Sequence, residues 1–107
     1  RADGPLVVRS WTDKSAEEAK LLALNLIRAG DLAALFGVAG ADRNRLIFAA
    51  AEKLELNLRE LVPLVQGLAA AKGGGSPSLV ELVVEPGVDL EPLLAAAAAH
   101  LRQKLPA

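Results

Sequence analysis

The chain has 107 residues, of which 52% are hydrophobic, and its acidic and basic residues nearly balance at a net charge of −1. This length fits one domain, and the composition supports a core and excludes a disordered chain. Aromatic residues make up only 3%, so the core must be aliphatic. The balance of charge excludes the uniformly basic surface of many nucleic-acid binders, so any RNA contact requires a local patch.

The sequence lacks cysteine, a long apolar run and a visible signal peptide, and each absence excludes a class of site or protein. Without cysteine the chain has no disulfide, no thiolate nucleophile and no cysteine-ligated metal. No apolar run approaches the roughly 18 residues that a membrane helix needs, and no signal peptide is visible. The chain starts at Arg1 and contains no methionine, so we expect residues 1–107 to be one domain of a longer protein that does not contact a membrane.

The N-terminal third predicts a strand followed by a helix. Residues 6–11 begin with an apolar run typical of a strand. Ser15 and Glu18 have the spacing of a capping box, in which each side chain bonds the other residue's backbone amide, so a helix is predicted over residues 16–28. Gly30 follows as its expected C-terminal cap.

The middle of the chain predicts a hairpin and a second helix. Residues 32–38 and 43–51 are two apolar segments, and the short link between them predicts an antiparallel pair of strands. Asn57 and Glu60 repeat the capping-box spacing, which predicts a helix over residues 58–72.

The C-terminal third is organised around three successive glycines, Gly73–Gly75. Glycine loses the most backbone freedom on ordering, so this run predicts a loop that ends the second helix. Residues 79–85 are apolar and β-branched and predict a strand, and Asp89 is the expected N-cap of a last helix. The predicted order is β-α-β-β-α-β-α. It indicates a single α/β (α+β) domain with one mixed sheet and helices packed mainly on one face, and the split βαβ topology is compatible with it.

The order of elements and four short segments resemble the DHH-associated domain. This domain is the C-terminal module of alanyl-tRNA synthetases, of freestanding alanyl-tRNA editing proteins and of DHH-type phosphoesterases. The segments are Leu6-Val7-Val8 with an acidic turn, Leu46-Ile47-Phe48-Ala49, Leu54-Glu55-Leu56-Asn57 and Lys72-Gly73-Gly74-Gly75-Ser76-Pro77. Three glycines, one residue and then proline resemble the synthetase and editing branch, although that branch usually has arginine where Ser76 stands. The phosphoesterase branch would have histidine there.

The resemblance implies a module that performs no chemistry by itself. In the family, editing belongs to a separate zinc-dependent domain. The implied role is to support tRNA binding or dimerisation beside the catalytic domain of a cytoplasmic parent, an alanyl-tRNA editing protein or an alanyl-tRNA synthetase. The alternative is the substrate-binding domain of a DHH-family phosphoesterase, and a third option is a purely structural dimerisation module.

The candidate nucleic-acid contacts are cations and small residues that can meet phosphates. They are Lys72, Gly73, Gly74, Gly75, Ser76, Arg43 and Arg45. Arg43 and Arg45 fall on one face of their strand, and Trp11 could stack on a base. In the alternative interpretation the glycines form a plain turn, and the cations are ordinary surface residues balanced by Glu52, Glu55 and Glu60.

The residues that could support catalysis or metal binding do not assemble into a constellation in the sequence. His100 is the single histidine and has no fixed second ligand, so we expect a surface or packing role. Glu81 and Glu85 share a strand face but fit a solvated face better than a metal or acid–base pair. We therefore predict no catalytic residue, no metal and no cofactor in this domain.

Association with a second copy is the remaining candidate role. Leu21 and Leu24 lie partly off the apolar stripe of the first helix, and an alanine-rich helix starts at Leu93. Both offer small apolar faces that could bury against a twin or pack on the sheet.

Overall fold

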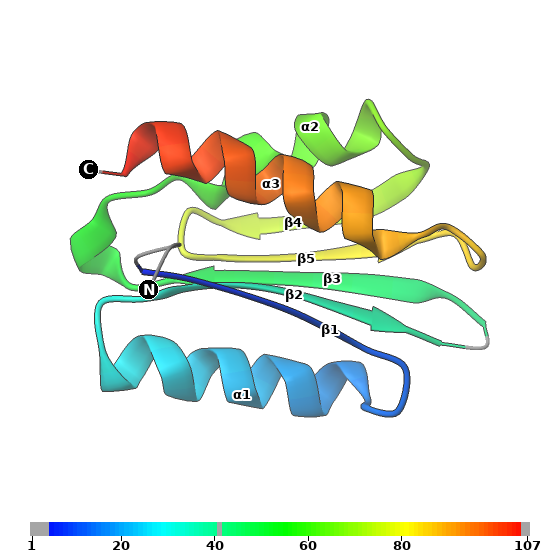
Figure 1. Cartoon of the computed structure of the whole chain (residues 1–107), viewed down its shortest axis with the longest axis horizontal. Coiled ribbons are helices and arrows are strands. Elements are labelled where there is room, and N and C mark those ends of the chain that lie inside the picture. The colour runs from blue at the N-terminus through cyan, green and yellow to red at the C-terminus, as the bar shows by residue number, and fades with distance from the viewer. Residues whose placement is uncertain (1–4, 41, 106–107) are drawn as a thin grey trace.

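The computed structural model describes residues 5–40 and 42–105, and these form five strands and three α-helices (Figure 1). The elements are β1 (Leu6–Trp11), α1 (Ala16–Ala29), β2 (Ala33–Ala39), β3 (Asn44–Ala50), the 3-10 turns η1 (Glu52–Leu54) and η2 (Leu58–Glu60), α2 (Leu61–Gln66), β4 (Ala71–Ser76), β5 (Leu79–Val84) and α3 (Leu90–Lys104). The predicted class, a single α/β domain built on one mixed sheet, is confirmed.

The sheet has the strand order β1-β2-β3-β5-β4. β1 runs parallel to β2, as the α1 crossover between them requires, and every other neighbouring pair is antiparallel. The predicted hairpin of β2 and β3 is confirmed, with Ala34 opposite Ala49.

Two helices share one face of the sheet, and the third covers the other. α2 and α3 lie over one face, and α1 lies over the opposite face (Figure 1). The larger core, on the α2 and α3 side, includes Leu35, Phe48 and Leu94. The smaller core contains Phe36 and Ile47 beneath α1. Because successive side chains of a strand point to opposite faces, β2 and β3 are mainly apolar and buried on both sides.

The predicted start of the first helix is confirmed in full. The Glu18 amide donates to Ser15 Oγ at 3.1 Å, and the Ser15 amide donates to Glu18 Oε1 at 2.9 Å. Hydrogen bonds from the Ser15 amide and hydroxyl lower the pKa of Glu18. The last helix also begins as predicted, since the Glu91 amide donates to Asp89 Oδ1 at 3.1 Å.

The prediction of a loop at Gly73–Gly75 is wrong. These residues belong to β4, which forms a hairpin with β5 in which Ser76 pairs with Leu79. The backbones of the two strands lie so close that only glycine fits at two positions. A Cβ atom at Gly73, whose φ is 137°, would collide with the carbonyl oxygen of Glu81, and one at Gly75 with that of Leu79. The predicted order therefore gains one strand.

The helix predicted over residues 58–72 is much shorter. Asn57 Oδ1 accepts from the Arg59 amide at 3.2 Å, but the turn that it caps is the 3-10 turn η2. The helix α2 follows and ends at Gln66, before Gly67. The Glu60 carboxylate, expected to complete a capping box, instead contacts His100 on α3.

Candidate nucleic-acid interface

The sheet register places Arg45 and Lys72 on the same face. Residues directly opposite one another in neighbouring strands point to the same side, and the row Trp11, Val38, Arg45, Val83, Lys72 crosses all five strands. We call these five residues the cross-sheet row. Arg45 and Lys72 are separated only by Val83, so their backbones are about 10 Å apart, which is two strand spacings.

Arg43 joins the same end of the sheet through a shallow hollow. It immediately precedes β3, and both Arg43 and Lys72 line a hollow of about 470 Å³. Its other lining residues are mainly apolar: Gln66, Ala69, Ala70, Ala71, Val83, Val84, Glu85 and Pro86. Two cations thus flank a largely apolar floor, an arrangement suited to an anion attached to an apolar or aromatic group.

The three predicted cations are not neutralised by carboxylates. None of Arg43, Arg45 and Lys72 forms an ion pair with another residue in the ranges 5–40 and 42–105. The balancing role expected for Glu60 is not observed, because its carboxylate is engaged elsewhere. This end of the sheet therefore holds three cations without ion pairs among the described residues, and the Glu85 carboxylate lines the same hollow.

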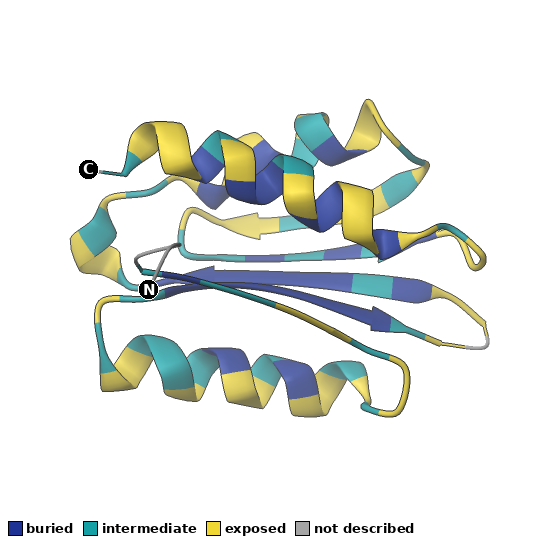
Figure 2. Cartoon of the chain, viewed as in Figure 1, coloured by how far each residue is buried: buried dark blue, intermediate teal, exposed yellow. Residues whose placement is uncertain are grey.

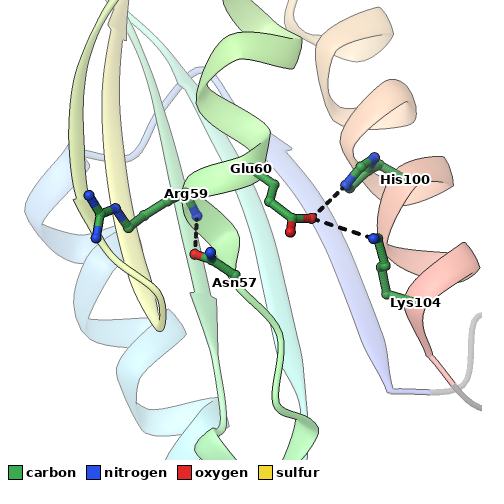
Figure 3. Close-up of polar contacts among 5 residues, drawn as sticks. All are labelled: Asn57, Arg59, Glu60, His100 and Lys104. Carbon is green, nitrogen blue, oxygen red and sulfur yellow. Dashed lines mark hydrogen bonds and ion pairs between the residues drawn. The ribbon is translucent and has the colours of Figure 1, made fainter.

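Glu60 ties the η2 turn to the last helix, as Figure 3 shows. His100 Nε2 lies 3.0 Å from Glu60 Oε1, and Lys104 Nζ lies 3.8 Å from the same oxygen. The hydrogen bond from His100, followed by the charge of Lys104, lowers the pKa of Glu60. The single histidine is half-buried on α3 and contacts this carboxylate, which is compatible with the surface or packing role expected from the sequence.

Trp11 occupies the far end of the cross-sheet row and is partly held by packing. Its ring meets Phe36 edge to face, with centroids 4.9 Å apart and an interplanar angle of 83°. Lys14 Nζ lies 5.4 Å from the centroid of the Trp11 ring, which adds a cation at this end of the row. The half-buried ring anchors β1 as well as presenting a surface.

The face that carries the cross-sheet row is incompletely covered. α1 lies over β2 and β3, whereas Leu79, Glu81 and Val83 of β5 remain half-buried on this face. Lys20 Nζ of α1 pairs with Glu81 Oε2 at 3.0 Å, so this carboxylate is neutralised at the border of the open area. A nucleic-acid backbone lying there would therefore meet cations, and the Glu81 carboxylate that faces it would already be paired.

The remaining predicted site residues lie along β4, away from Arg43. Gly74 is on the open face, and a Cβ atom added there would meet nothing within 4 Å. Ser76 Oγ accepts from the Leu79 amide at 3.2 Å, which fixes the turn of the hairpin. The structure thus brings Lys72, Arg43 and Arg45 together, while Ser76 lies at the opposite end of its strand.

Gln66 is the residue of this area that no sequence pattern singled out. It lines the hollow beside Arg43 and Lys72, and its Nε2 donates to the carbonyl oxygen of Ala71 at 3.2 Å. A polar residue in the last turn of a short helix has no distinctive pattern. Its role depends on how α2 leads into β4, which no local signal indicated.

Among the described residues there is no group of three or more His, Asp or Glu side chains arranged to hold a metal ion. The helices in the same part of the chain are too short or too polar to cross a bilayer.

Comparison with known proteins gives solved structures of the same fold. No family model and no curated protein matches the sequence. The C-Ala domain of alanyl-tRNA synthetase from Aquifex aeolicus superposes with a TM-score of 0.74 and 18% identity, over 94% of this chain and 89% of that one. RecJ from Thermus thermophilus, solved with Mg²⁺, superposes with a TM-score of 0.69 and 10% identity, over 97% of this chain.

A DHH-domain protein described as a member of the s1p family of ribosomal proteins is a third neighbour, with a TM-score of 0.56 and 17% identity over 89% of this chain. The chain spans 15% of RecJ and 23% of this third protein. At such identities the likeness establishes the fold. The resemblance predicted from the sequence, to the C-terminal domain of alanyl-tRNA synthetases and to DHH proteins, is confirmed at that level.

Proposed function

We propose that this domain is a non-catalytic accessory module that supports tRNA binding in an alanyl-tRNA synthetase or an alanyl-tRNA editing protein. The observation that carries the proposal is the gathering of Arg43, Arg45 and Lys72, without ion-pair partners among the described residues, at one end of an incompletely covered sheet. The fold likeness to the C-Ala domain of alanyl-tRNA synthetase supports this class of parent.

The arrangement suits contacts to a sugar-phosphate backbone. Arg45 and Lys72, about 10 Å apart on one face, would contact different phosphates of a strand that crosses the sheet. Arg43 would hold a further phosphate at the hollow, whose alanine-lined floor accepts a ribose or base. Three such contacts give modest, salt-sensitive affinity, which fits a module that assists a catalytic domain elsewhere in a cytoplasmic parent.

Two other roles have a specific observation in their favour. The fold likeness to RecJ and to a DHH domain supports a substrate-binding domain of a DHH-family phosphoesterase, although Ser76 stands where that branch has histidine. Dimerisation is supported by exposed apolar side chains, chiefly Leu21, which is 63% exposed on α1. The alanine-rich α3 does not serve this role with its inner side, since Ala97 and Ala98 are buried in the core.

A salt titration of labelled tRNA-Ala binding tests the main proposal. Replacing Arg43, Arg45 and Lys72 together by alanine should weaken binding and reduce the slope of log affinity against log salt by about 3, roughly one for each lost phosphate contact. Lys53→Ala is the matched control, because this exposed lysine follows the other end of β3. Its slope should be unchanged.

Two results would contradict the proposal. A folded wild-type domain that does not bind tRNA at low salt has no such role on its own. An equal loss of affinity in Lys53→Ala and Lys72→Ala would show that binding reflects general charge rather than this end of the sheet. Binding of a nucleotide in preference to tRNA would favour the phosphoesterase alternative.

A further inference from the structure

The strand β4 lies at the margin of the sheet with one side of its backbone open. Among the described residues its one strand neighbour is β5. The Ala50 amide donates to the Ser78 carbonyl at 3.0 Å, so even-numbered residues of β5 bond β3 and odd-numbered ones bond β4. By the same alternation, Ala71, Gly73 and Gly75 of β4 direct their amides and carbonyls away from the sheet.

The opposite margin of the sheet is protected by a side chain, whereas the glycine segment of this margin is not. The Ala33 amide donates to the Pro5 carbonyl, so the even-numbered residues of β1 face outward. There the guanidinium of Arg9 donates to the carbonyl oxygen of Val8 at 2.8 Å and so occupies an outward acceptor. Natural proteins protect sheet edges by such devices. Gly73 and Gly75 are exposed and have no side chain that could do the same.

The outer side of β4 is complementary to itself. If two copies pair antiparallel about a two-fold axis at Gly74, Gly73 of one copy lies opposite Gly75 of the other. Each such pair exchanges both backbone hydrogen bonds. Lys72 then lies opposite Ser76 of the second copy, so the pairing places no like charges opposite one another.

At its ends this register adds no hydrogen bond between the copies, because the Pro77 carbonyl already accepts from the Leu58 amide at 2.9 Å. Ala71 would lie opposite Pro77 of the second copy, and proline has no amide hydrogen to donate. The carbonyl of Ala71 needs none, because it already accepts from Gln66 Nε2 at 3.2 Å.

We infer that the outer edge of β4 is a docking surface for the same strand of a second copy, which joins two sheets through Gly73 and Gly75. This inference rests on the dimerisation candidate above and assigns it a surface other than Leu21. It is independent of tRNA binding, since Arg45 and Lys72 point from the face of the sheet and not from its edge.

Single cysteines on β4 test this register, because the chain has no cysteine of its own. In the two-fold pair, position 74 faces its own copy at a Cα separation of about 4.5 Å, which a disulfide can bridge. Ser76 lies on the same strand and face, but its two copies would be about 14 Å apart. Gly74→Cys is the probe and Ser76→Cys the matched control. A Cβ at position 74 meets nothing within 4 Å, so the probe preserves the fold.

We expect Gly74→Cys to form a disulfide-linked dimer roughly tenfold faster than Ser76→Cys under mild oxidation, because paired thiols react at high effective concentration. Non-reducing gels measure the rate, circular dichroism checks the fold, and sedimentation gives the mass of the wild type. A wild-type dimer with equal cross-linking of both variants would overturn this edge and leave dimerisation standing. A wild-type monomer at submillimolar concentration would overturn both the docking edge and dimerisation itself. Neither result bears on tRNA binding.

Discussion

β3 and β4 belong to one sheet, yet they are built in opposite ways. β3 is buried at six of its seven positions, whereas β4 has no buried residue. Figure 2 shows the contrast, with β3 mainly dark blue and β4 yellow and teal. β3 is held by apolar side chains on both faces, and β4 is held by backbone pairing to β5 and by the close approach that its glycines allow.

The difference separates the part of the sheet that stabilises the fold from the part where the proposed contacts lie. Apolar surface buried in the centre provides most of the free energy of folding. β4 buries no residue and contributes less, and its backbone groups and Lys72 are exposed at the margin of the sheet. Lys72 and the outward glycines lie here, and Arg45 reaches the same area from the one half-buried position of β3.

The largest expected effect on the free energy of unfolding comes from removing a large buried side chain from the centre of the sheet. Phe48 on β3 is fully buried, so Phe48→Ala should lower the free energy of unfolding by about 3–5 kcal/mol. Val83→Ala on the half-buried side of β5 is the comparison, and its loss should be about 1 kcal/mol. Urea denaturation of both variants measures the difference. Similar losses would mean that the half-buried side of β5 contributes as much to stability as the buried centre, and the contrast between the two parts of the sheet would fail.

The next effect concerns the glycines within β4 itself. Gly73→Ala and Gly75→Ala force a Cβ atom against the carbonyl oxygens of Glu81 and Leu79, so each should lower the free energy of unfolding by about 1–3 kcal/mol. Gly74→Ala has open space and should change it by less than about 0.5 kcal/mol. The denaturation midpoints of the three variants measure these differences in stability. If all three lose stability equally, the tight spacing of β4 and β5 is not the reason for the glycines.

Sequence patterns predicted the structure correctly where the signal lies within a few neighbouring residues. The Ser15–Glu18 capping box needs only four consecutive residues, and the hairpin of β2 and β3 needs two apolar runs and a short link. The glycine strand could not be predicted in this way. Low intrinsic preference argues against a strand at Gly73–Gly75, but pairing with β5 overrides it, since glycine alone permits that spacing.

The candidate site was predictable in its residue types and not in its geometry. Arg43, Arg45 and Lys72 were selected by charge, but their proximity depends on β5 lying between β3 and β4. Asn44, between the two arginines, illustrates the same limit. It is buried, with its Oδ1 accepting from the Gly40 amide and its Nδ2 donating to the Val88 carbonyl. Val88 is 44 residues away in the sequence, and no local pattern anticipates such a contact.

The smallest effect tests how the hairpin is tied to the rest of the domain. The η2 turn contacts the hairpin through a hydrogen bond from the Leu58 amide to the Pro77 carbonyl at 2.9 Å, and Glu60 of the same turn holds His100 and Lys104 of α3. The pKa of Glu60 is lowered from its ordinary value of 4.5, so its ionised form stabilises the fold above that pH. This contribution is lost as the pH falls through the lowered pKa.

Glu60→Gln should therefore be slightly less stable than the wild type at neutral pH, and the two should converge as the pH falls below 4.5. Glu55→Gln, at an exposed carboxylate of the preceding segment, is the control and should show no such convergence. Urea denaturation at a series of pH values measures both, and amide exchange at β4 shows where stability is lost. If the Glu60 contacts stabilise the hairpin in particular, β4 amides should exchange faster in Glu60→Gln than in the wild type, while the exchange of β3 amides is unchanged. Equally faster amide exchange in both strands would mean that the Glu60 contacts stabilise the whole domain. The hairpin would then not open independently of the centre of the sheet.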